Sequence, residues 1–338
     1  MLLILSNWQK NNARYLFNMK TSRYLFPNDY MADPSAHVFE DKIYIYPSHD
    51  WESGVPENDN GDHFNMRDYH VFSMDDPDAE VVDHGVALAT ADIPWAGRQL
   101  WDSDVAHKDG KYYMYFPLKD QNDIFRMGVA ISDRPQGPFI PEENPMKGSY
   151  SIDPCLFEEN GAYYMYFGGI WGGQLQFYRN NKLVPPCELP HFHEPALCPK
   201  IAKLKDNMLE FAEAPRDVLL LDEEGNPLKQ GDTERRFFEA SWVHKYGGKY
   251  YFSYSTGDTH LLCYAIGDNP YGPFTYQGVI MTPVVGWTTH HSILEFKNKW
   301  YLFYHDAVPS GGKTWLRSMK MVELEYDENG AIKTIAGQ

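Results

Sequence analysis

Residues 241–255, SWVHKYGGKYYFSYS, consist of two apolar, tyrosine-rich runs separated by a turn that contains two glycines. Alternating side chains on both sides of a short glycine turn are typical of a β-hairpin. Four further copies of the pattern are AHVFEDKIYIYPS at 36–48, DVAHKDGKYYMYFP at 104–117, CLFEENGAYYMYFGG at 155–169 and SILEFKNKWYLFYHD at 292–306. Five matched hairpins indicate that the fold is built from repeats.

The spacing of these copies predicts the architecture. From Tyr44 to Tyr301, the aligned tyrosines recur on average about every 64 residues, which leaves room for four strands and functional loops in each unit. A four-stranded unit cannot bury its own faces, whereas radial closure buries them and leaves only short edges. We therefore predict an all-β, five-bladed β-propeller that forms a single domain. A β-sandwich would not explain five matched hairpins.

Two segments lie outside the repeats. Met19 offers a second start, so we expect residues 1–18 to be an N-terminal extension and residues 19–338 to form the propeller. Residues 185–236 are rich in proline and interrupt the rhythm of the hairpins. We interpret them as an insertion between the third and fourth blades, with one short helix around IAKLKDNMLEFAEA.

Three hairpins are preceded by an acidic residue: Asp33 in YMADPSAHVF, Asp153 in YSIDPCLFEE and Glu239 in RFFEASWVHK. The first strand of each propeller blade lines the central channel, so residues just before that strand gather at one mouth. The proline after each Asp biases that Asp toward extended backbone. Asp-Pro can also simply start a turn, but three acids at the same phase of three repeats favour a shared site.

Crowding of these three acids suits the cleavage of a glycosidic bond. At least one of them should have a raised pKa, because like charges repel. The reaction needs one protonated acid for the leaving oxygen and one ionised base for water. We assign the acid to Glu239, which has aromatic neighbours, and the base to Asp33. Asp153 would keep the pKa of Glu239 high and orient it. Inversion requires the two carboxyl groups to be about 6.5 to 9.5 Å apart, and retention about 5 Å.

Further candidate residues precede the second and fifth hairpins or lie in loops. Trp101, Trp171 and Trp287 could stack on sugar rings, and Asp102 could bind hydroxyl groups. His290 takes the axial place in the fifth unit, where an imidazole could bind a metal or an ordered water. Calcium prefers oxygen ligands, so such a site would include several waters. Each of these residues could equally be structural.

The composition limits the class of partner. The formal net charge is −17, and such a field repels nucleic acid and anionic lipid but not a neutral oligosaccharide. Aromatic residues make up 15% of the chain, which suits both strands and sugar binding. No stretch approaches a membrane span, and the start of the chain lacks the basic and apolar regions of a signal peptide. We therefore expect a cytoplasmic protein.

Taken together, these motifs resemble glycoside hydrolase family 43. ADPS at 32–35 is similar to the motif of the family's base, SIDPCLF at 151–157 to that of its pKa-modulating Asp, and residues 237–255 to the block around its acid. The resemblance implies these roles for Asp33, Asp153 and Glu239. HHSI at 290–293 is similar to the block whose His contacts a central calcium or its waters. Arg317, in WLRSMKMVEL, is placed like a sugar-binding Arg of the family. Many members have Gly where this chain has Ala240.

The resemblance implies an inverting hydrolase that releases terminal xylose or arabinofuranose from oligosaccharides derived from xylan or arabinan. The sequence leaves both sugars open. Rival readings are a β-fructosidase, a mannoside phosphorylase or a propeller that binds sugar without catalysis. A phosphorylase needs basic residues clustered for phosphate, and none are clustered near the three acids in the sequence. A fructosidase nucleophile requires a closer pair of carboxylates.

Overall fold

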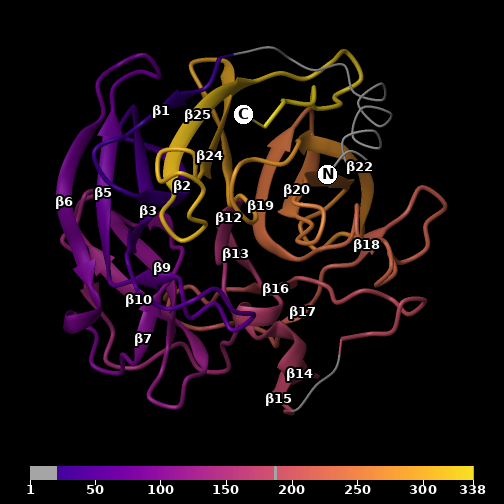
Figure 1. Ribbon diagram of the computed structural model, residues 1–338, viewed down its shortest axis with the longest axis horizontal. Coiled ribbons are helices and arrows are strands. Elements are labelled where there is room, and N and C mark those ends of the chain that lie inside the picture. Colours follow the sequence, from indigo (N-terminus) through magenta and orange to yellow (C-terminus); the bar gives the residue numbers. More distant parts are fainter. Residues whose placement is uncertain (1–20, 186–188, 338) are drawn as a thin grey trace.

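The computed structural model describes residues 21–185 and 189–337 (Figure 1). The predicted extension, residues 1–18, lies outside the described residues. Five β-sheets surround a central axis, and Figure 1 shows them following the chain from indigo through magenta and orange to yellow. The all-β, five-bladed propeller predicted from the repeated hairpins is therefore confirmed. No helix in the described part of the chain is long and apolar enough to span a bilayer.

Each blade is a meander that runs outward from the axis. The first three blades consist of β2 (Met31–Phe39), β3 (Lys42–Trp51), β5 (Asp68–Met74) and β6 (Val82–Ala89); β8 (Asp104–Lys108), β9 (Lys111–Lys119), β10 (Phe125–Ser132) and β11 (Ile140–Pro141); and β12 (Cys155–Glu159), β13 (Ala162–Phe167), β16 (Lys200–Lys203) and β17 (Arg216–Asp217). The last two consist of β19 (Glu239–Tyr246), β20 (Lys249–Ser255), β21 (Leu262–Gly267) and β22 (Phe274–Met281); and β23 (Ser292–Phe296), β24 (Lys299–Asp306), β25 (Ser318–Leu324) and β1 (Arg23–Tyr24).

Several short strands and 3₁₀ turns lie between the main strands of the five blades. They are β4 (Asn65–Met66), which pairs with β3; β7 (Arg98–Leu100), which pairs with β9; the hairpin of β14 (Tyr178–Arg179) and β15 (Lys182–Leu183); β18 (Leu220–Leu221); and three 3₁₀ turns, Thr90–Asp92, Trp171–Gly173 and Leu175–Phe177. All of them lie in or beside loops between the main strands.

The five inner hairpins share one turn geometry. In each, two residues with positive φ connect the first and second strands of the blade, as in a type I′ turn. The turns are Glu40-Asp41, Asp109-Gly110, Asn160-Gly161, Gly247-Gly248 and Lys297-Asn298. Because this turn matches the right-handed twist of the flanking strands, the turn residues set the register at the hairpin end of each inner strand pair.

The segment 185–236 departs from the expected insertion. Its strands β16 and β17 complete the sheet of the third blade, and β18 pairs in parallel with β22 of the fourth. The described residues of this segment contain no helix, so the helix expected around IAKLKDNMLEFAEA is not there. Its residues 200–203 instead hydrogen-bond to β13, because an outer strand satisfies backbone groups that the third blade would otherwise leave exposed.

The ring is closed by the N-terminal part of the described chain. β1 pairs antiparallel with β25, so the fifth blade contains strands from both ends of the sequence. At the axis, the Ser292 hydroxyl donates to the Pro34 carbonyl oxygen at 2.6 Å and accepts the Ala36 N–H at 3.0 Å. This closure places Asp33, the residue before Pro34, beside the loops of the fifth blade.

Neighbouring blades pack through apolar side chains. Tyr46, Tyr69 and Phe116 belong to the cluster between the first two blades, and Phe72 and Phe303 to the cluster between the fifth and the first. These side chains are fully buried, and each aromatic ring removes about 150–250 Å² from water. The packing holds the inner strands, and therefore the residues before them, in fixed positions around the axis.

Candidate active site

A cavity of about 550 Å³ lies where the inner strands begin. Its wall consists largely of residues that precede those strands or belong to the loops beside them. All nine site residues predicted from the sequence line it: Asp33, Trp101, Asp102, Asp153, Trp171, Glu239, Trp287, His290 and Arg317. Because every blade contributes at least one of them, radial closure is what brings these residues together.

The backbone at the two Asp-Pro motifs is not extended, as we had expected. Asp33 has φ of +46° and Asp153 has φ of +61°, both in the left-handed region. The Asp33 N–H donates to Nδ1 of His305 at 3.1 Å, and the pairing of β2 with β3 shifts register between Ala32 and Ser35. Asp tolerates this conformation better than most residues. Tertiary contacts therefore override the local preference that the proline imposes.

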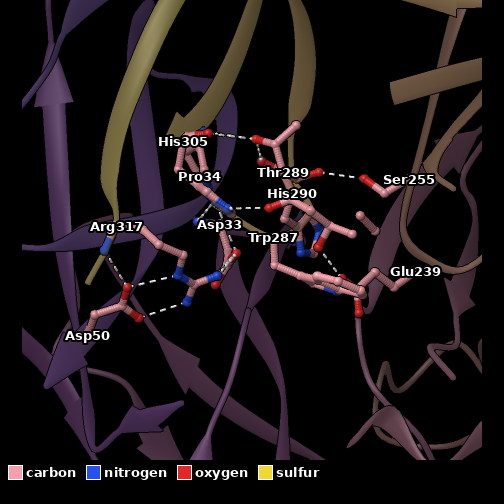
Figure 2. Close-up of polar contacts among 12 residues, drawn as sticks. Asp33, Pro34, Asp50, Glu239, Ser255, Trp287, Thr289, His290, His305 and Arg317 are labelled. Carbon is pink, nitrogen blue, oxygen red and sulfur yellow. Dashed lines mark hydrogen bonds and ion pairs between the residues drawn. The ribbon is translucent and has the colours of Figure 1, made fainter. Parts of the chain in front are cut away.

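Asp33 forms an ion pair with Arg317, whose guanidinium lies between Asp33 and Asp50 (Figure 2). Nη1 of Arg317 donates to Oδ1 of Asp33 at 2.7 Å, while Nε and Nη2 donate to both oxygens of Asp50 at 2.8 and 2.7 Å. Burial by itself would raise the pKa of Asp33, but Arg317, with smaller contributions from His305, His290 and the Ser48 hydroxyl, outweighs burial and lowers the pKa to about 2. Asp33 is therefore ionised at neutral pH.

His305 supports Asp33 as a neutral ring. Burial lowers the pKa of His305 to about 3. Its Nε2–H donates to the Thr288 carbonyl oxygen at 3.1 Å, which leaves Nδ1 free to accept the Asp33 N–H. This tautomer places no positive charge on the ring. Arg317 is therefore the cation that stabilises the Asp33 carboxylate.

Glu239 has the opposite electrostatic setting. It begins β19 beside Phe238 and reaches the cavity wall. Burial raises the pKa of Glu239 to about 7, and the charges of Asp102 and Asp33 contribute, although a hydrogen bond from the Thr288 hydroxyl works against them. One cavity therefore holds a carboxyl group that is ionised at neutral pH and another that is protonated in a substantial fraction of molecules.

Asp153 supports Glu239 through the backbone. Its Oδ2 accepts the N–H of Ala240, the residue after Glu239, at 2.5 Å. Ala240 has φ of +64°, a conformation that favours glycine. This conformation accounts for the Gly that many similar proteins have at the position of Ala240. Burial, Asp102 and Glu239 raise the pKa of Asp153 well above its usual range. The hydrogen bond to Ala240 fits the orienting role predicted for Asp153, and its effect on the pKa of Glu239 stays a prediction.

Aromatic rings form one side of the cavity. The rings of Trp171 and Trp287 stack with centroids 5.6 Å apart, and Phe238 meets Trp171 edge-on at 5.3 Å. Trp171 sits in a tight 3₁₀ turn that ends at Gly173, where a Cβ would approach the Ile152 side chain to 2.7 Å. A side chain at Gly173 would therefore displace Ile152, so glycine lets the turn pack closely beside the cavity.

Trp101 is held in place by more protein contacts than a residue that only lines the cavity. It is only 7% exposed, its Nε1–H donates to the Phe64 carbonyl oxygen at 3.2 Å, and its ring packs against Phe125 at 4.7 Å. It contributes an apolar edge to the cavity and also fills the space beneath it. Packing accounts for this position, and the sugar contact of Trp101 stays a prediction.

Asp102, Asp153 and His290 form a cluster that could hold a cation. One ligand atom from each lies within 4.8 Å of the others. Oδ2 of Asp102 is buried and has no hydrogen-bond partner among the described residues, although buried carboxylate oxygens are normally satisfied. Two carboxylates and one imidazole fit a divalent cation that completes its shell with water. The His290 predicted to contact a metal therefore lies in a cluster that suits one.

Comparison with known sequences identifies the family. The model for glycosyl hydrolases family 43 matches residues 25–332, which is nearly the entire described chain. The chain belongs to glycosyl hydrolases family 43. Over 323 residues it is 72% identical to a xylosidase/arabinosidase of Bacteroides ovatus, an alignment that spans 95% of this chain and 99% of that protein. The family 43 resemblance seen in the motifs is thus confirmed over the whole propeller.

Solved structures of similar proteins have the same fold as this chain. The structure of RS223 β-xylosidase superposes with a TM-score of 0.93 at 74% identity, covering 95% of this chain and 100% of the other. CoXyl43, a GH43 β-xylosidase/α-arabinofuranosidase from a compost microbial metagenome, was solved with xylotriose in a calcium-free form; it superposes with a TM-score of 0.92 at 60% identity and covers 94% of this chain and 98% of its own. This protein is therefore a family 43 glycoside hydrolase, and its described residues form the same propeller as these two structures.

Sequence reasoning missed three residues of this family 43 site. Asp50 anchors Arg317, His305 supports Asp33, and the Thr288 hydroxyl donates to Glu239. Asp50 lies in the YIYPSHD block and His305 in the FYHD that ends the fifth hairpin, each at the end of a second blade strand. A polar residue in the last positions of a tyrosine-rich strand was the signal that could have indicated both.

Proposed function

We propose that this protein releases terminal xylose or arabinofuranose from xylo-oligosaccharides by a single displacement that inverts the anomeric centre. The observation that carries the proposal is the opposite pKa shift of two carboxyl groups in one cavity, with Asp33 at about 2 and Glu239 at about 7. One ionised and one protonated carboxyl group are what glycoside hydrolysis requires. The named activities of the similar proteins support the choice of sugars.

In the proposed reaction, Glu239 donates its proton to the glycosidic oxygen while the bond from that oxygen to the anomeric carbon breaks. Asp33 accepts a proton from the water that attacks the opposite face of the same carbon. The new carbon–oxygen bond forms on the face opposite the leaving group, so the configuration inverts. Arg317 holds Asp33 ionised and fixes its direction through Asp50. Asp153 keeps the backbone at Glu239 in place through Ala240.

The cavity also suits recognition of a neutral sugar. The stacked Trp171 and Trp287 provide apolar ring faces, and the flat faces of sugars pack well on such surfaces. Asp102 and Arg317 add polar groups for hydroxyls. Because Arg317 already binds two carboxylates, its positive charge is compensated and their negative charges would repel a phosphate beside it, which favours hydrolysis over phosphorolysis.

We further propose that the cation held by Asp102, Asp153 and His290 is calcium, with waters completing its shell. A bound divalent cation would hold the two aspartates ionised and fix their positions at the base of the cavity. The existence of a solved calcium-free form of CoXyl43 supports this choice of ion. The proton transfers themselves remain assigned to Asp33 and Glu239.

Removal of calcium is expected to lower both the thermal midpoint and kcat. Binding to the folded state alone adds about 2.7 kcal/mol of stability at 100 times Kd, so the midpoint should fall by a few degrees after chelation. Added Ca²⁺ should restore both values. In the Asp102→Asn variant, which weakens the cluster, chelation should shift the midpoint much less. Unchanged midpoint and activity in the chelated wild type would contradict a calcium site.

The proposed activity is tested by the release of nitrophenol from nitrophenyl β-xyloside and nitrophenyl α-L-arabinofuranoside. We expect turnover of at least one of them, with xylose released from xylotriose and no acceleration by added phosphate. Proton NMR of the first xylose formed from a β-xyloside should show the α-anomer. Initial formation of the β-anomer would contradict inversion, and the absence of turnover on both aryl substrates would contradict the enzyme itself.

A further inference from the structure

A second cluster of histidines and aspartates lies in the first blade. His49 belongs to β3, Asp68 and His70 to β5, and Asp83 to β6, so three adjacent strands contribute. One ligand atom each of His49, Asp68 and His70 lies within 4.8 Å of the others. None of these residues lines the catalytic cavity. The proposed hydrolysis therefore uses none of them.

The two imidazoles converge on one carboxylate. Nδ1 of His49 lies 2.5 Å from Oδ1 of Asp68, and Nε2 of His70 lies 4.0 Å from the same oxygen. The two rings meet edge to face with centroids 5.1 Å apart. Two imidazole nitrogens and one carboxylate oxygen therefore lie close enough together to share one ion.

In each imidazole, the ring nitrogen that points away from Asp68 contacts another carboxylate. Nε2 of His49 lies 3.3 Å from Oδ2 of Asp29, and Nδ1 of His70 lies 3.0 Å from Oδ1 of Asp83. In metal sites, a ligating histidine almost always donates its other N–H to such a partner, which sets the tautomer and makes the ligand nitrogen more basic. Both remote nitrogens are engaged here. The near nitrogen of His49 donates to Asp68, a hydrogen bond that a metal ion between the two groups would replace.

The cluster is also open to solvent on one side. The His49 side chain is 6% exposed, whereas Asp68 is 14% and His70 is 17% exposed. The outer carboxylates are more exposed still, with Asp83 at 28% and Asp29 at 46%. An ion could reach the inner atoms from this side, and water could occupy a remaining coordination position.

We propose that His49, Asp68 and His70 bind a divalent transition metal of the zinc class. Two imidazoles and one carboxylate are typical ligands for Zn²⁺, with water in the fourth position. Nitrogen donors disfavour Ca²⁺ and Mg²⁺ at such a site. The ion links β3 to β5 and compensates the negative charges of Asp29, Asp68 and Asp83. It acts as a cross-link within the first blade, separate from the cation cluster of the catalytic cavity.

The test uses the full chain, free of any affinity tag and stripped with chelator, titrated with Zn²⁺ alone by calorimetry near pH 7.5. The His290→Ala substitution removes the imidazole of the cavity cluster. Zinc that still binds to the His290→Ala protein is therefore assigned to the first blade. We expect one zinc per chain in this background. Co²⁺ at the same site should give the visible absorption of a low-coordinate centre with nitrogen and oxygen ligands.

Substitutions in the cluster should lower the zinc affinity to different degrees. His70→Ala should abolish the stoichiometric site, and Asp83→Asn, which removes only the partner behind His70, should weaken zinc about 10- to 100-fold. The matched control is His84→Ala: this exposed histidine of the same blade binds the Ser73 hydroxyl at 2.8 Å and lies outside the cluster. It should bind zinc like the parent.

The Asp83 and His84 variants change exposed positions, so they keep the test decisive if His70→Ala does not fold. Activity on the nitrophenyl substrates, measured without the His290 substitution, should be unchanged in the variants of this blade. The proposal is overturned if the His290→Ala background binds no stoichiometric zinc, or if His70→Ala and Asp83→Asn leave the zinc affinity as it was. Either result is independent of whether the chain proves to be a xylosidase.

Discussion

Replacing Asp33 by asparagine is expected to reduce kcat by about 10²- to 10⁴-fold on every substrate, the usual contribution of a general base. An amide cannot accept the proton of the attacking water, and that attack is needed whatever the leaving group. The ion pair with Arg317, which holds the pKa of Asp33 at about 2, is also lost. Steady-state kinetics on an aryl glycoside and on xylotriose should show the same loss.

A second variant separates a lost base from a damaged fold. Asp33→Gly suits the positive φ of this position and leaves space beside the anomeric carbon. Azide, which needs no base to attack, should restore turnover and yield a glycosyl azide of inverted configuration. Arg317 keeps its two hydrogen bonds to Asp50 in both variants, so the thermal midpoint should change modestly. Retention of more than a tenth of wild-type kcat by Asp33→Asn would refute the assignment.

Replacing Glu239 by glutamine is expected to separate substrates by leaving group. Xylotriose, whose leaving sugar is a poor leaving group, should lose about 10²- to 10⁴-fold in kcat, because the glycosidic oxygen needs the proton. An aryl glycoside with a strongly acidic phenol should lose far less, since its oxygen departs without protonation. Equal losses on both substrates would show that Glu239 is not the acid.

The pH profile provides an independent check on Glu239. The acid must be protonated, so activity is present below its pKa and declines as the pH rises through about 7. Asp33, with a pKa of about 2, stays ionised across this range and leaves the decline to Glu239. In Glu239→Gln the decline should disappear for the activated aryl substrate.

Thr288 offers a matched control for that profile. Its hydroxyl donates to the Glu239 carboxylate and lowers the pKa of this group. Thr288→Val removes the donor, so the pKa should rise and the alkaline decline should move to higher pH. A shift to lower pH, or none, would contradict this account of the Glu239 environment.

Much of this site could be predicted because each motif is local and is repeated. Asp33, Asp153 and Glu239 stand at one phase of their repeats, so the propeller was enough to place them around one cavity. The backbone at Asp33 could not be predicted in the same way. Its proline favours extended geometry, but the contact from its N–H to His305 selects the left-handed region instead.

The outer strands of the third blade show the same limit. Residues 185–236 lack the hairpin pattern, because β16 and β17 are short and are joined by irregular loops. Their strand conformation follows from hydrogen bonds to β13 and to each other. Such pairing partners are set by which edge lies nearby, and a local pattern of residues does not encode that.

The sequence by itself determined the five hairpins, since each depends on a two-residue turn and the alternation beside it, and through them the number of blades. It also determined which acids stand at the start of the inner hairpins. Only the tertiary structure decided how those acids ionise. Arg317 reaches Asp33 because ring closure joins β1 to β25 and brings the fifth blade against the first, and the pKa of Glu239 is raised to about 7 because the closed ring surrounds its carboxyl group with protein. Charge–charge energy and burial depend on distances across the ring, and those distances exist only once it has closed.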